Sequence, residues 1–269
     1  MLEHDDERAR QIKLAAQQQW SHDPAGGLAS GEEELGTPES FARVERYRYQ
    51  EQPWMHDTFQ YQRFAGLRVL EIGVGLGTDH LQFARAGGHM AGIDLTPRCV
   101  ELTQRRLEQE GLSSDLRIMD AEHLDFQDDA FDVVYSFGVL HHTASAERAF
   151  REVRRVLRPG GLFIGGLYNR HSIVTAAMRA QCILIPRYRG MSFQERLSLV
   201  EYSTSEDRAR PYVRLFSTRE LRQRLRDAGF TETKLFRRHF GIKLRRRVPS
   251  WLDAVLGRIA GWYVVHEAS

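Results

Sequence analysis

The sequence predicts an α/β fold, in which helices cover both faces of a mostly parallel sheet. From residue 68 to residue 168, short continuous apolar runs alternate with helical segments, and buried parallel strands have this character. The glycine-rich turn "GVGLG" at residues 73–77 directly follows the first run. Glycine costs stability in a regular element, so three glycines in five residues indicate that a ligand or another strand lies against the turn.

The N-terminal segment, residues 1–66, is expected to form a helical cap. Helical stretches at residues 5–20 and 40–49 flank a loop rich in Gly, Ser and Pro. Neither helix is long enough to enclose a core alone. We therefore expect a lid over the following domain and not a separate domain.

Residues 67–169 are expected to form the ligand-binding core. Its apolar runs are "RVLEIG", "HMAGIDL", "LRIMD", "FDVVYSF" and "GLFIGGLY", with helices at about 78–86, 97–109 and 146–157. Thr96 can cap the second helix, with Pro97 at its first position. The Pro-Gly-Gly sequence at 159–161 is expected to end the third helix near Arg158.

Two further segments follow the core. Residues 170–216 are less regular and are expected to form a substrate-lid insertion. Residues 217–269 are expected to complete the sheet with a strand at about 231–240 and a terminal strand at 261–267, separated by a basic helical insert with a short helix near 250–258. The preceding helix is expected to start with a capping box of Ser217 and Glu220 and to end at Gly229.

The composition excludes several classes of function. The formal net charge of +2 is too small to indicate a nucleic-acid or membrane partner, and we interpret the basic residues between 237 and 247 as a solvated surface. Cys99 and Cys182 are the only cysteines, so we expect neither a disulfide framework nor a zinc site, and no metal. The charged N-terminus without an apolar segment favours a cytoplasmic protein, a monomer or homodimer with a small-molecule partner.

Polar residues at the ends of the apolar runs describe a nucleoside pocket, because ligands of open parallel sheets bind outside the carboxyl ends of the strands. Asp94, about 20 residues beyond the first glycine, can accept hydrogen bonds from both hydroxyls of a ribose. Asp120 can accept one from an exocyclic amine, and Leu95 and Phe137 offer apolar surfaces to a flat base.

The glycine turn indicates what is attached to the nucleoside. A dinucleotide fingerprint reads G-x-G-x-x-G, whereas the spacing here is G-x-G-x-G. Asp79 stands in the first turn of the next helix, where a carboxylate would repel a pyrophosphate but can pair with an ammonium group, and Glu71 adds a second acid. This pattern disfavours an NAD-dependent dehydrogenase. Asp79 is equally explained as a charge that complements the helix dipole.

Four ordered motifs, "VLEIGVGLGTD", "GIDLTP", "DAEHLDFQDDAFDVVYSFGVLHH" and "REVRRVLRPGGLFI", resemble those of class I S-adenosylmethionine-dependent methyltransferases, in particular the group called methyltransferase type 11. The resemblance covers residues 67–168 strongly and 217–267 more weakly. It implies a Rossmann-like fold, with a seven-stranded, mostly parallel sheet whose last strand is antiparallel. It also implies S-adenosylmethionine as the cofactor.

The resemblance further implies a role for each motif. The turn from Glu71 to Gly77 would lie against the methionine portion of the cofactor, and Asp94 would hold its ribose. Asp120 and the backbone after it would contact adenine. The segment 136–142 would lie beside the methyl group that is transferred. The cofactor-binding residues expected from the pattern and the resemblance together are Glu71, Gly73, Gly75, Gly77, Thr78, Asp79, Asp94, Leu95, Asp120, Ala121, Glu122, Ser136, Phe137 and His141.

The activity expected from this resemblance is methyl transfer to the O, N or C atom of a small molecule, such as one of specialised metabolism. A phenol or carbon acceptor needs a general base, for which His141 and His142 are candidates, although either can instead pack or bind the cofactor. Aromatic side chains that can contact the acceptor, or equally pack within the lid, are Trp20, Tyr47, Tyr49, Tyr168 and His171.

Two alternatives remain open at this level. One is methylation of RNA or protein, which requires an open basic face. The other is a protein that binds the cofactor without transferring a methyl group, because a fold does not determine an activity.

Overall fold

The computed structural model describes residues 2–31, 33–201, 210–240 and 250–269. Its centre is a seven-stranded sheet in the order β3-β2-β1-β4-β5-β7-β6, in which the last strand, β7, runs antiparallel to both of its neighbours. This confirms the predicted sheet. The strands are β1 (Arg68–Ile72), β2 (His89–Asp94), β3 (Asp115–Ile118), β4 (Phe131–Phe137), β5 (Leu157–Tyr168), β6 (Thr233–Arg238) and β7 (Tyr263–Ala268).

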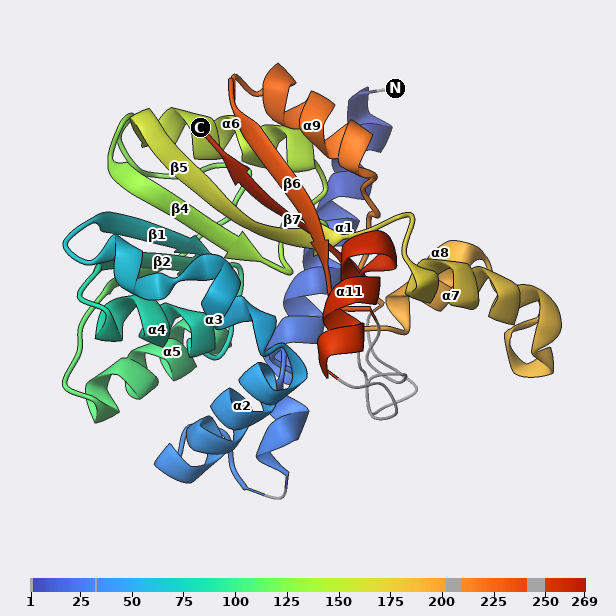
Figure 1. Ribbon diagram of the computed structural model, residues 1–269, viewed down its shortest axis with the longest axis horizontal. Coiled ribbons are helices and arrows are strands. Elements are labelled where there is room, and N and C mark those ends of the chain that lie inside the picture. The colour runs from blue at the N-terminus through green and yellow to red at the C-terminus, as the bar shows by residue number, and fades with distance from the viewer. Residues whose placement is uncertain (1, 32, 202–209, 241–249) are drawn as a thin grey trace.

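Helices cover both faces of this sheet (Figure 1). Alternate residues of β1 point to opposite faces: Leu70 and Ile72 pack in the core under α6 and α9, and Val69 packs in the core under α4. Those helices are α4 (Thr78–Arg85), α6 (Ala146–Val156) and α9 (Thr218–Asp227), and α5 (Pro97–Gln109) packs beside α4. Burial on both faces explains why the strands are continuously apolar.

The helix ends follow the sequence signals with two differences. Thr96 caps α5 as predicted, since its hydroxyl accepts from the backbone N–H of Cys99. The third core helix, α6, ends at Val156 and not near Arg158, because β5 begins at once and the Pro-Gly-Gly sequence bulges out of its pairing with β4. Ser217 caps α9, but the Glu220 side chain forms ion pairs with two arginines, so the capping box is only half formed.

The N-terminal segment packs along one edge of the core. It contains α1 (Leu2–His22), η1 (Gly27–Ser30), α2 (Pro38–Glu51), α3 (Trp54–Phe59) and η2 (Tyr61–Phe64), so both expected helices are longer than the sequence indicates. Helix α1 contacts α5, and α2 contacts α4 and α5. The segment thereby covers the carboxyl ends of β1 and β2. The domain boundaries themselves stay predictions.

The segment after β5 extends away from the sheet (Figure 1). It contains α7 (Ile173–Leu184), η3 (Pro186–Tyr188) and α8 (Phe193–Ser198). Between β6 and β7, the helix α11 (Ser250–Ala260) packs against β6. Most of the expected basic insert, residues 241–249, lies outside the described residues. None of the helices within the described ranges combines the length and the apolar character needed to cross a membrane.

Candidate functional site

A cavity of about 330 Å³ opens at the carboxyl ends of β1, β2 and β4, beneath α1 and α2. This volume lies within the range of small-molecule sites. Most of the site residues predicted from the sequence line this cavity. They are Trp20, Tyr47, Glu71, Gly73, Gly75, Thr78, Asp79, Asp94, Leu95, Asp120, Ala121, Glu122, Phe137, His142 and Tyr168.

The three glycines of the turn serve different purposes. At Gly73 a Cβ would lie 2.3 Å from Val139, and at Gly77 it would lie 3.0 Å from Thr103, so these two glycines permit close packing. A Cβ at Gly75, whose φ is +56°, would meet no atom within 4 Å. Only Gly75 therefore faces open space, and it does so inside the cavity.

Asp94 is held by the turn that it faces. Its Oδ2 accepts from the Gly75 N–H at 3.0 Å, and its Oδ1 accepts from the Thr96 N–H at 3.0 Å and from the Thr96 hydroxyl at 2.9 Å. Burial raises the pKa of Asp94 above its usual value, and these hydrogen bonds oppose that shift. The Asp94 carboxylate lines the cavity, so a ligand hydroxyl can approach it there.

The residues that follow β3 form ion pairs with α1. The Lys13 ammonium lies 2.6 Å from Asp120 Oδ2 and 3.1 Å from Glu122 Oε2, and all three residues line the cavity. The Glu122 side chain is fully buried, and its other oxygen accepts from the Ser145 N–H. This ion pair holds α1 over the part of the pocket where the sequence predicts that the flat base of the nucleoside binds.

Glu71 belongs to a buried proton network. The Ser114 hydroxyl donates to the Met90 carbonyl, so it accepts from His80 Nε2 at 2.9 Å and leaves His80 Nδ1 to face Glu71 at 2.9 Å. Burial lowers the pKa of His80 to about 3. Burial and then the charge of Asp79 raise the pKa of Glu71. Both shifts favour a neutral pair, in which the protonated Glu71 carboxyl donates a hydrogen bond to His80 Nδ1.

Asp79 already has a cationic partner. Arg48 donates to both of its oxygens, at 3.3 Å and 2.5 Å, and the hydroxyls of Tyr49 and Tyr135 donate to them at 2.9 Å and 2.8 Å. The Arg48 guanidinium also lies over the Phe137 ring, 5.0 Å from its centre. The sequence explained Asp79 equally as a partner for a ligand ammonium or as a charge that complements the helix dipole. In the structure Arg48 balances the Asp79 charge and lines the cavity with it.

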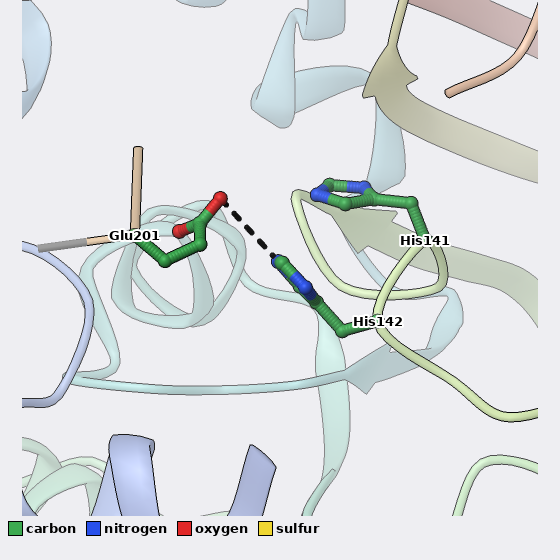
Figure 2. A group of neighbouring side chains, drawn as sticks. All are labelled: His141, His142 and Glu201. Carbon is green, nitrogen blue, oxygen red and sulfur yellow. Dashed lines mark ion pairs between the residues drawn. The ribbon is translucent and has the colours of Figure 1, made fainter. Parts of the chain in front are cut away.

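The two neighbouring histidines differ in environment. His142 donates from Nδ1 to the Tyr212 carbonyl at 2.8 Å, which leaves Nε2 facing Glu201 Oε1 at 3.7 Å (Figure 2). His142 and Glu201 both line the cavity. His141 does not: its ring is fully buried, 4.0 Å from the Tyr168 ring, and burial followed by the proximity of His142 lowers the pKa of His141.

Several residues that the sequence predicted for the site do not line the cavity. The Ser136 hydroxyl donates to the Ile72 carbonyl, Gly77 caps α4, Tyr49 holds Asp79, and His171 is exposed beyond the end of β5. Conversely, sequence reasoning missed lining residues that include Lys13, Arg48, Gln52, His239, Tyr263 and Glu201. In the sequence these read as ordinary helix-face or strand residues, and only the tertiary packing brings them together.

Comparison with known proteins matches the core of the fold. Residues 70–165 match a family model described as a methyltransferase domain. The chain is 36% identical over 123 residues to a ubiquinone biosynthesis O-methyltransferase of Cereibacter sphaeroides (45% of this chain, 50% of the relative). It is 34% identical over 107 residues to a sterol 24-C-methyltransferase of Gibberella zeae (39% and 28%). The chain thus spans half or less of these relatives' lengths.

Solved structures share the overall fold. A [4+2]-cyclase, SpnF, superposes with a TM-score of 0.55 at 17% identity, covering 95% of this chain and 94% of the cyclase. An S-adenosylmethionine-dependent methyltransferase from Mesorhizobium loti also gives 0.55, at 15% identity, over 80% of this chain and 96% of that one. At such identities the likeness concerns the fold alone.

The residues present fit the cofactor of this family. Gly75 leaves room over the turn, and the carboxylates of Asp94 and Asp120 line the cavity together with the apolar side chains of Leu95 and Ala121. The matched domain, the sheet order and the structural neighbours agree. Residues 70–165 therefore match a methyltransferase domain, within the fold that S-adenosylmethionine-dependent methyltransferases share, and S-adenosylmethionine is the cofactor that this match implies.

Proposed function

We propose that this protein transfers the methyl group of S-adenosylmethionine to the O, N or C atom of a small molecule. The observation that carries the proposal is the continuity of one cavity. It is lined at one end by the glycine turn and Asp94 and at the other by Tyr168, His142 and Glu201. Cofactor and acceptor can therefore meet inside one enclosed space, as an in-line displacement requires.

The cofactor end would be organised along the strand ends. Asp94 would hold the ribose, Asp120 and the backbone of Ala121 would face the base, and Gly75 would lie against the methionine portion. A ligand ammonium beside Glu71 would favour ionisation of that buried carboxyl. The Arg48–Asp79 pair would mark the boundary with the acceptor chamber.

The acceptor end supports a small molecule over RNA or protein. Its walls come from α1 and α2 and from the segments after β4 and α8, so the chamber is covered and not an open basic face. Trp20, Tyr47 and Tyr168 contribute aromatic surface to it. The names of the two relatives refer to ubiquinone biosynthesis and to a sterol, which agrees with a small acceptor.

The chain's own residues would position and prepare the acceptor. S-adenosylmethionine supplies an electrophilic methyl group, so the C–S bond breaks as the acceptor lone pair forms its bond to carbon. His142 lines the chamber and remains the candidate to receive the acceptor's proton. The cytoplasmic setting suggested by the sequence agrees with Cys99 and Cys182 being free thiols.

A screen with methyl-labelled S-adenosylmethionine tests this function. The full chain is incubated with small-molecule fractions, with RNA and with protein, and label transfer is measured. We expect label in a small molecule and none in the two polymers. Transfer only to RNA or protein would overturn the small-molecule proposal.

The fold alone does not establish methyl transfer, since a [4+2]-cyclase shares it, so the second candidate is a protein that binds the cofactor without transferring a methyl group. Tight cofactor binding combined with no label transfer to any fraction would identify that case.

A further inference from the structure

Three potential metal ligands converge on the acceptor end of the cavity. His141 and His142 follow β4, and Glu201 follows α8, so two distant parts of the chain supply them (Figure 2). One ligand atom from each lies within 4.8 Å of the other two, and His142 Nε2 lies 3.7 Å from Glu201 Oε1. The sequence indicated His141 and His142 as candidates for a general base, but it did not indicate Glu201, which is distant in the chain.

The polar atoms of this group are buried without partners. Within the part of the chain that the structure describes, neither ring nitrogen of His141, nor Nε2 of His142, nor Oε1 of Glu201 has a hydrogen-bond partner. The exposure of the three is 0% for His141, 6% for His142 and 10% for the Glu201 side chain. Buried polar atoms normally have a hydrogen-bond partner, whereas both ring nitrogens of His141 have none, and His142 Nε2 and Glu201 Oε1 face each other beyond hydrogen-bond distance, at 3.7 Å. A species bound between the three side chains would satisfy these atoms.

The protonation pattern favours a cation as that species. The Nδ1 proton of His142 is committed to the Tyr212 carbonyl, so Nε2 presents a lone pair, the arrangement that orients metal-binding histidines in general. A carboxylate oxygen completes a set of lone pairs that face one another and that a shared positive charge would satisfy.

The ligand types select the kind of metal. Two imidazole nitrogens and one carboxylate oxygen suit Zn²⁺ and similar divalent transition ions, whereas Mg²⁺ and Ca²⁺ prefer oxygen ligands. In a tetrahedral zinc site the ligand atoms are roughly 3.3 Å apart. The 3.7 Å pair is close to that spacing, and the other two separations, which are at most 4.8 Å, would reach it through rotation of both the His141 ring and the Glu201 side chain.

We propose that His141, His142 and Glu201 bind one divalent transition-metal ion of the Zn²⁺ type, with an open coordination position toward the cavity. His142 and Glu201 line that cavity, so an oxygen of the acceptor can occupy the open position. The ion would lower the pKa of a bound hydroxyl, whose proton leaves to water before the oxygen takes the methyl group. This role in turnover rests on the proposed function, but metal binding itself does not.

Metal binding by the full chain tests the proposal directly. The protein is stripped with a chelator and dialysed, then titrated with Zn²⁺ by calorimetry and with Co²⁺ by visible absorption, and Mg²⁺ serves as the oxygen-preferring contrast. We expect one Zn²⁺ per chain and a tetrahedral Co²⁺ spectrum, with no comparable binding of Mg²⁺. His142→Ala and Glu201→Gln should each weaken Zn²⁺ binding by at least tenfold, as should His141→Ala if that variant folds.

The controls separate this site from surface histidines and from loss of fold. His89 is exposed at the amino end of β2, away from the cavity, so His89→Ala should leave Zn²⁺ binding unchanged. Circular dichroism verifies the fold of each variant, and S-adenosylmethionine affinity, measured separately, reports on the proposed function. The proposal is overturned if the stripped wild type binds no stoichiometric Zn²⁺, or if His142→Ala and Glu201→Gln bind it as wild type does, in which case ordered water satisfies these atoms.

Discussion

At the scale of single residues, His141 and His142 show how one loop gives the same side chain two environments. The His141 ring is fully buried beside Tyr168, whereas His142 lines the cavity and uses Nδ1 to donate to the Tyr212 carbonyl. A group that acts on the acceptor has to reach it, so His142 is the stronger of the two candidates from the sequence. This holds whether Nε2 takes a proton directly or binds an ion.

His142→Ala should therefore reduce turnover far more than cofactor binding. We expect kcat to fall by about 10²–10⁴-fold, the usual contribution of acid–base groups, with the Kd for S-adenosylmethionine nearly unchanged. Single-turnover kinetics and calorimetry measure the two quantities. Full activity of the variant would show that the acceptor needs no help from this residue. Chelation of the wild type distinguishes the two roles, because a base on Nε2 would be unaffected by it.

At the scale of elements, α1 acts on the site through one ion pair. Lys13 bridges α1 to Asp120 and Glu122, whose backbone follows β3. The lysine side chain is 27% exposed, so the pair contributes modestly to global stability, while the buried Glu122 carboxylate gives it a local role. The sequence indicated a helical cap from its pattern, but it did not indicate which side chain would fasten that cap.

Lys13→Gln should loosen α1 without unfolding the protein. We expect faster hydrogen exchange of α1 amides and faster dissociation of S-adenosylmethionine, with a melting temperature close to that of wild type. Arg10→Gln is the matched control, because Arg10 is an exposed residue of the same helix. Unchanged exchange and dissociation in Lys13→Gln would contradict the fastening role.

At the scale of the whole molecule, the sheet could be predicted and the site only in part. Alternating apolar runs and helix signals such as Thr96 depend on local sequence, so they predict the strands and α5 correctly. The acids at strand ends reach the cavity because parallel strands share one edge. The partner of Asp79 and the position of Glu201 depend on packing between distant segments, which no local pattern encodes.

Buried neutral histidines should also make the whole fold sensitive to acid. Burial lowers the pKa of His80 and of His266 to about 3, against 6.5 when unfolded, so the unfolded chain binds more protons between these values. The unfolding free energy should thus fall as pH drops below 6.5, by about 1.4 kcal/mol per pH unit for each histidine. Chemical denaturation at a series of pH values measures this slope.

His266→Leu isolates one contribution to that slope. This residue lies fully buried beside Phe163, so a leucine can occupy a similar apolar volume without a titrating ring. The slope between pH 6 and pH 4 should become shallower by about 1.4 kcal/mol per pH unit. The exposed His89→Leu should keep the wild-type slope, and an equal slope in His266→Leu would refute the assignment.

The central claim is that the cavity at the carboxyl edge of the sheet binds S-adenosylmethionine with Asp94 as an anchor. Calorimetric titration of the full chain is its most direct measurement, on wild type, Asp94→Ala, Asp94→Asn and the control Asp227→Ala, which alters an exposed residue at the end of α9. We predict one cofactor per chain, at least tenfold weaker binding by both Asp94 variants, which is about 1.4 kcal/mol, and wild-type affinity in the control. No binding by wild type, or unchanged affinity in folded Asp94→Ala, would contradict the account.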